Sequence, residues 1–187
     1  MAGKPRQAKI RVLSAKNDFL KKLVLNQWVM TRFGIDPLEQ YRDKGSQVRP
    51  VTLLNKNLKE SQPGLTGDRH HHYLHALLGG YQSSWQYSEE DLKRFDANIV
   101  EHTDALNQQR EVEVEWKYFQ WLTLLFVEIY LFEYFRDREA LKEGLNAQVD
   151  RFNAFWQGQG YQTGIGRYQD EDLNKLCLQN ATGSGKT

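Results

Sequence analysis

A long apolar run between residues 111 and 136 places the strongest constraint on the fold. This stretch contains neither glycine nor proline, and its middle part, from Trp116 to Val127, is apolar on most faces of a helix. A helix that is apolar nearly all round lies inside a core, covered by other elements. Its uninterrupted apolar stretches are far shorter than the roughly 20 residues that span a bilayer. We therefore predict a soluble, mainly α-helical bundle of about four to six helices, with helix 111–136 at its centre.

Segments on both sides of this run carry apolar residues at helical spacing. Ser88 followed by acidic residues predicts a helix start, and Asp137 predicts the cap of a helix that ends near residue 156. The first of these helices carries the stripe Leu92, Phe95, Ile99, His102 and Leu106, in which His102 is expected at the edge of the core. The second carries the stripe Leu141, Leu145, Val149, Phe152 and Trp156.

The N-terminal third is predicted to be less regular. Asn17 or Asp18 can cap a helix that runs to about Phe33, with Gly34 as its stop. Asp36-Pro37 is typical of a helix cap followed by a first-turn proline, which predicts a short helix at 36–42. Residues 43–70 are rich in Gly, Pro, Ser, Asn and Lys, so we expect a long loop with a short helical turn at 51–58.

A cluster of histidines follows, in the segment from Gly67 to His75. On a helix, His71 and His75 would share a face and could ligate a metal, with Asp68, Glu101 or His102 as further ligands. The alternative is a polar helix start in which one or two histidines are buried and hydrogen-bonded. We favour this alternative and therefore predict no metal site. His71 and His75 are the weak candidates for metal ligands.

Charge is distributed unevenly along the chain. Residues 1–60 carry 13 Lys/Arg and 5 Asp/Glu, whereas residues 88–150 carry 7 and 15. A basic arm could bind nucleic acid phosphates, or the two segments could pack together and neutralise each other. We favour the second interpretation. Cys177 is the only cysteine, which excludes an intrachain disulfide and fits a reducing cytoplasm.

Two acidic residues lie within the apolar run. Glu128 and Glu133 are five positions apart, so they do not share a helix face and form a poor carboxylate pair for acid–base chemistry. We expect both to be structural or surface groups. We predict no catalytic residue in this chain.

The sequence ends in a phosphate-binding pattern, Ala181-Thr182-Gly183-Ser184-Gly185-Lys186-Thr187. The glycines let the backbone wrap around a triphosphate, and its N–H groups point at the anion. Lys186 would contact the β and γ phosphates and Thr187 would contact Mg²⁺. The apolar run 176–179 is suited to a buried strand that leads into this loop. In the general pattern G-x-x-x-x-G-K-[ST], Asn180 occupies the first glycine position.

The motif Ala181–Thr187 resembles motif I of the DEAD/DEAH-type helicases and of the R subunits of restriction enzymes, in which Ala-Thr-Gly-(Ser/Thr)-Gly-Lys-Thr is common. Residues 168–180, which precede the motif, resemble the segment that precedes motif I in those proteins. Residues 124–136 resemble a part of those proteins more loosely. The resemblance implies an ATP-driven motor on nucleic acid, DNA rather than RNA, in a restriction or phage-defence system. It implies ATP and Mg²⁺ as cofactors of the full-length parent protein and Gln169 as a candidate adenine contact.

The expected organisation has four parts. Residues 1–16 form a basic flexible tail and 17–157 a helical accessory domain. Residues 158–167 form a glycine-rich linker, and 168–187 start a truncated RecA-like α/β ATPase domain. Because no residues follow the loop, we expect this chain alone to bind ATP weakly or not at all and not to hydrolyse it. The alternative function is a protein-interaction or assembly module for a partner subunit, without a direct role on nucleic acid.

Overall fold

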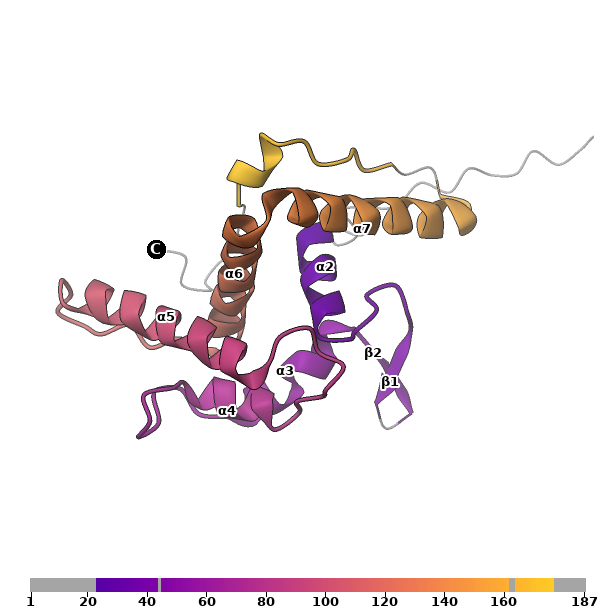
Figure 1. Ribbon diagram of the computed structural model, residues 1–187. Helices are drawn as coiled ribbons and strands as arrows, with labels where there is room; N and C mark the ends of the chain where they lie inside the picture. Colours follow the sequence, from indigo (N-terminus) through magenta and orange to yellow (C-terminus); the bar gives the residue numbers. More distant parts are fainter. Residues whose placement is uncertain (1–22, 44, 162–163, 177–187) are drawn as a thin grey trace, which may run out of the picture.

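The computed structural model describes residues 23–43, 45–161 and 164–176 (Figure 1). This part of the chain is mainly helical, as predicted, with six α-helices and one small antiparallel sheet. The elements are α2 (Val24–Arg32), β1 (Tyr41–Asp43), β2 (Ser46–Val48), α3 (Val51–Glu60), α4 (His72–Leu78), α5 (Glu89–Asn107), α6 (Tyr118–Arg136), α7 (Arg138–Gly158) and the 3₁₀ turn η1 (Asp172–Asn174).

Helix α6 lies at the centre, in contact with α2, α3, α5 and α7. Trp121, Leu125 and Ile129 have no exposed surface, which confirms the central position predicted from the apolar run. The helix begins only at Tyr118, so the predicted start at residue 111 is wrong. Residues before it are extended and are held by side chains: the Trp116 indole donates to Thr103 Oγ1 over 2.8 Å. None of the described helices is long and apolar enough to cross a membrane.

The predicted starts of α5 and α7 are confirmed. Ser88 and Asp91 form a reciprocal capping box at α5, and the Asp137 side chain accepts from the Ala140 N–H over 3.0 Å at α7. The stripe of α7 is buried from Leu141 to Phe152.

The stripe of α5 is buried only from Leu92 to Ile99. His102 is exposed and Leu106 is 42% exposed, so placing His102 at the core edge is wrong. The reason is visible in Figure 1, where the C-terminal turns of α5 extend beyond the other helices.

The N-terminal region differs more from expectation. Helix α2 begins at Val24 because Leu23 has a ψ of 57°, outside the helical range; the predicted residues 17–22 lie outside the described part. Gly34 ends this segment with a φ of +69°, as expected for a glycine stop.

The short helix predicted at 36–42 is wrong. The Asp36 carboxylate accepts from the Leu38 N–H over 3.0 Å, which makes an Asx turn in place of a helix cap. The chain then pairs as the hairpin β1–β2, with Tyr41 opposite Val48. The predicted long loop is shorter than expected, because α3 forms a full amphipathic helix with Leu54 and Leu58 buried.

Helices α2 and α7 approach each other closely at Gly144. A Cβ atom there would lie 2.9 Å from Trp28 Nε1 and 3.3 Å from an Arg32 guanidinium nitrogen. The Arg32 guanidinium also lies 4.3 Å from the centre of the Trp28 ring. Gly144 therefore allows α2, and with it the N-terminal region, to pack against α7.

Candidate functional site: the lead-in to the phosphate loop

The phosphate-binding residues Ala181–Thr187 lie outside the described part of the chain, as do Cys177 and Asn180. The nearest described segment is residues 164–176, named the C-terminal strap. In Figure 1 the strap runs from the far end of α7 back along that helix to the junction of α6 and α7. Its placement decides where the phosphate loop can begin.

Two asparagines of α7 hold the strap by its backbone. Asn153 donates to the Ile165 carbonyl over 2.9 Å and accepts from the Ile165 N–H over 2.8 Å. Asn146 makes the same pair of bonds with Tyr168, over 3.1 and 2.7 Å. The two asparagines are seven positions apart, two helical turns, so they share one face of α7. Each side-chain amide thus replaces the backbone partner that a neighbouring strand would supply.

Two tyrosines of α6 hold the end of the strap. The Tyr130 hydroxyl donates to the Leu173 carbonyl over 2.7 Å in a buried position, and Leu173 itself is only 2% exposed. The Tyr134 hydroxyl donates to Asn174 Oδ1 over 2.8 Å at the surface. Burial raises the pKa of Tyr130 to about 12, so its hydroxyl remains a donor throughout the neutral range.

One strap carboxylate adds an exposed ionic contact. Asp170 pairs with Lys142 over 2.8 Å, and its carbonyl accepts from Arg138. Hydrogen bonding to Lys142 lowers the pKa of Asp170. Arg167 also pairs with Asp150 of α7 over 3.7 Å, so the strap is attached at six residues. The segment 164–167, predicted as part of a linker, lies along α7.

Gln169, the candidate adenine contact, is exposed at the start of η1. Its backbone N–H donates to the Asp172 carboxylate over 2.9 Å, which begins the 3₁₀ turn. Its side-chain amide lies 3.5 Å from the Arg167 carbonyl. This arrangement leaves the side chain at the surface, and a role in adenine binding stays a prediction.

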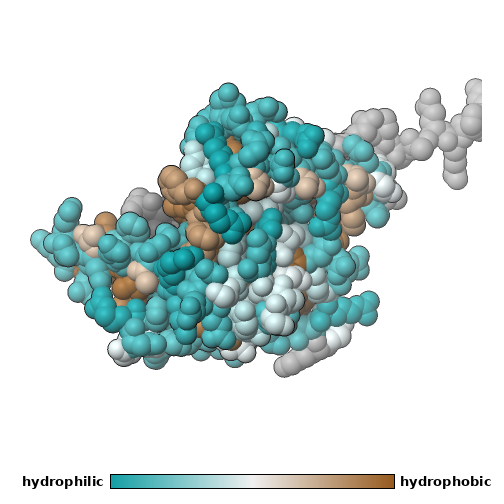
Figure 2. Space-filling view, in the orientation of Figure 1, coloured by the Kyte–Doolittle hydropathy of each residue, from teal (hydrophilic) through white to brown (hydrophobic). Residues whose placement is uncertain are grey.

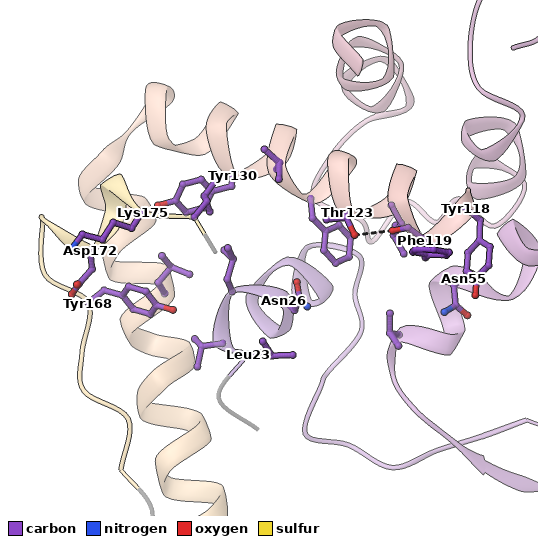
Figure 3. Close-up of a pocket in the computed structure, with 18 residues that line it drawn as sticks. Leu23, Asn26, Asn55, Tyr118, Phe119, Thr123, Tyr130, Tyr168, Asp172 and Lys175 are labelled. Carbon is purple, nitrogen blue, oxygen red and sulfur yellow. Dashed lines mark hydrogen bonds between the residues drawn. The ribbon is translucent and has the colours of Figure 1, made fainter. Parts of the chain in front are cut away.

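A pocket of about 430 Å³ is lined by the strap, α2 and α6 (Figure 3). The strap contributes Tyr168, Asp172, Lys175 and Leu176 to its lining, and most of the remaining lining is apolar. At the end farthest from the strap lies Asn55, whose Oδ1 atom is buried with no hydrogen-bond partner. No local sequence pattern signals this pocket, because its lining residues come from distant segments of the chain.

The histidine cluster is organised by one carboxylate that the sequence analysis did not single out. Asp96 of α5 is fully buried and accepts four hydrogen bonds. These come from His70 Nδ1 at 3.0 Å, the His71 N–H at 3.0 Å, His71 Nδ1 at 2.7 Å and the Trp121 indole at 2.7 Å. Burial alone would raise the Asp96 pKa, but the hydrogen bonds from His71 and Trp121 outweigh burial and lower it.

His71 and His75 are weak candidates for metal ligands because they would share a helix face, but only His75 lies within α4. His71 precedes α4 with extended backbone angles, φ −65° and ψ 140°, and its ring is buried against Asp96. His75 Nε2 lies 3.4 Å from Asp68 Oδ1. Within the described ranges no group of three or more His, Cys, Asp or Glu side chains is arranged to hold a metal ion. The arrangement of His71 matches the alternative of a buried, hydrogen-bonded histidine.

The two glutamates of α6 have separate environments. Glu133 is 4% exposed, accepts from the Tyr87 hydroxyl over 2.8 Å and pairs with Arg136. Burial and the neighbouring Glu133 raise the pKa of Tyr87. Glu128 accepts from Asn98 over 3.0 Å at the surface. Glu133 therefore links α6 to the loop before α5, and Glu128 links α6 to α5, as expected for structural or surface groups.

No family model matches this chain, and no curated protein or solved structure resembles it closely enough to count as a match. The case for a function therefore rests on the residues of the chain itself.

Proposed function

We propose that this chain is the N-terminal accessory part of an ATP-dependent helicase or translocase, of the kind found in DNA restriction or phage defence. In this proposal the helical domain fixes the position at which the motor begins. The observation that carries it is the attachment of the strap to α6 and α7 immediately before a phosphate-binding motif.

The attachment limits where the motif can lie. Ala181 follows Leu176 by five residues, which reach at most about 18 Å when fully extended. A motor that starts at this loop is therefore tethered close to the α6–α7 junction. A short tether suits an accessory domain that braces a motor, because it keeps the two parts close together.

The motif residues themselves define the expected chemistry. In the full-length protein the backbone around Gly183 and Gly185 would hold the ATP phosphates, with Lys186 against the β and γ phosphates and Thr187 on Mg²⁺. Bound Mg²⁺ would neutralise charge on the triphosphate. No catalytic group is proposed among residues 23–176, so the proposal assigns hydrolysis to the full-length parent protein.

The test is the ATPase activity of the protein together with whatever residues follow Thr187 in its gene. DNA should stimulate that activity, and Lys186→Ala should abolish it. In the Asn146→Ala/Asn153→Ala variant, the phosphate loop remains intact while the strap is loosened. Its DNA-stimulated rate should fall although its basal ATP affinity is kept. If neither ATP binding nor DNA stimulation is detected, the motor assignment fails.

The alternative is a protein-interaction module, and one surface favours it. The end of α5 and the chain after it expose apolar side chains, with Leu106 42% and Val112 78% exposed. Figure 2 shows small apolar areas within the otherwise hydrophilic surface of this projecting end. Binding of duplex DNA to the chain at several salt concentrations separates the two functions. Affinity that falls steeply with salt supports phosphate contact, whereas no DNA binding favours assembly with a partner subunit.

A further inference from the structure

Both ends of the described part of the chain border the pocket beside the strap. Leu23 and Leu176, the first and last residues that the structure describes, both line it. The rest of the lining is dominated by side chains of α6, including Phe119, Leu122 and Phe126. An apolar pocket of about 430 Å³ has room for two large side chains. Burying apolar side chains in it stabilises the fold, and water in the pocket would not give this stabilisation.

We propose that this pocket is the docking site of the chain's own N-terminal segment, with Phe19 and Leu20 as the side chains that fill it. Only Lys21 and Lys22 separate them from Leu23. Because three residues span at most about 11 Å, Leu20 can reach the pocket without any rearrangement of the described fold. The ψ of Leu23, 57°, lies outside the helical range, so the segment before it need not continue along the axis of α2.

Charge and polarity fit the same occupant. Lys21 and Lys22 directly precede Leu23 in the sequence, and the strap that borders the pocket carries Asp170, Glu171 and Asp172. Asp172 lines the pocket together with one cation, Lys175. The Asn55 Oδ1 atom, buried without a partner, can accept a hydrogen bond from a backbone N–H of an inserted segment.

This docking does not depend on the proposed motor function. Its consequence is a second contact on the strap, because the segment would pack between α6 and residues 168–176. The N-terminal segment would then help to hold the strap residues that Asn146 and Tyr130 also hold.

A photo-crosslinking residue at position 19 in the full chain tests the placement directly. We expect intramolecular crosslinks to α6, between Phe119 and Val127. Crosslinks that map to another surface, or to a second molecule only, would overturn the proposal. The same residue at position 10 is the control, since Ile10 is an apolar residue of the same segment to which the proposal gives no place in the pocket.

A second measurement uses the Phe19→Ser/Leu20→Ser variant with Ile10→Ser/Val12→Ser as the matched control. The first variant should bind an environment-sensitive apolar dye at least roughly twofold more strongly than the wild type. It should also exchange amide hydrogens faster in residues 119–127, and a peptide of residues 10–22 added in trans should reverse both effects. Strong dye binding by the wild type that the variant leaves unchanged would mean an open pocket and would contradict the proposal.

Discussion

The two ends of α6 are fixed in different ways. At its N-terminal end the Trp121 indole donates to the fully buried Asp96, which also accepts hydrogen bonds from both histidines that precede α4. At its C-terminal end Tyr130 and Tyr134 hold the strap, with one bond buried and one at the surface. The first arrangement joins α4, α5 and α6 into one core. The second attaches the strap, and we expect that the strap can be released while the helices remain folded.

The largest effect is expected from Asp96→Ala. This change leaves the Trp121 and His71 donors buried without an acceptor, so the free energy of unfolding should fall by about 3–5 kcal/mol. Chemical denaturation measures it. Asp104→Ala on the same helix is the control, because its ion pair with Arg69 is exposed and its loss should cost less than about 1 kcal/mol. Equal losses for the two variants would show that the buried network does not hold this end of α6.

The Asp96 network also shows how far the sequence could predict this molecule. Ser88, Asp137 and the stripe of α7 are local patterns, and the structure confirms them. Asp96 lies at the i+4 position from Leu92, inside the apolar stripe of α5. That position was a signal for a buried carboxylate, but its donors come from residues 70, 71 and 121.

The strap and the hairpin could not be predicted for the same physical reason. Asp36-Pro37 has the residues of a helix start, but the Tyr41 hydroxyl accepts from the Asp36 N–H over 2.8 Å and the chain pairs with residues 46–48. The glycines between 158 and 166 are typical of a linker. Contacts with side chains of α6 and α7, such as Asn153 and Tyr130, show that the residues from Ile165 onward are held. Contacts between distant segments outweighed local pattern in both places.

Asn146→Ala/Asn153→Ala should release the strap without unfolding the helices. Four side-chain bonds to its backbone are lost, although alanine is the better helix former and offsets part of the cost. We expect a loss of about 1–3 kcal/mol. Faster hydrogen exchange should be confined to residues 164–176. Glu143→Ala, exposed on the same helix, is the control. Faster exchange throughout α5 and α6 would show that strap and core are one cooperative unit.

Tyr130→Phe should have a smaller effect, at the buried end of the strap. The ring stays in place, but the Leu173 carbonyl loses its donor, which should cost about 1 kcal/mol. Tyr134→Phe is the matched control, since its bond to Asn174 is exposed and water can replace it. The thermal midpoint of each variant measures the effect. Equal shifts for the two variants would show that the buried bond of Tyr130 contributes no more than the exposed bond of Tyr134.

The smallest effect separates the two ends of α6 by salt and not by pH. Asp96 and Asp170 both have folded-state pKa values below the usual value for aspartate. A carboxyl with a depressed folded pKa contributes stability above its unfolded pKa of about 3.9, and that contribution is lost as the pH falls through the folded pKa. Both contributions should therefore be complete at neutral pH and disappear only in acid.

Salt distinguishes the two carboxylates, because the exposed Asp170–Lys142 pair is screened while the buried Asp96 is not. Raising the ionic strength at neutral pH should speed hydrogen exchange slightly in the strap and leave residues around Asp96 unchanged. A salt response at the Asp96 end would mean that its network is open to solvent, and the contrast between the two ends of α6 would then fail.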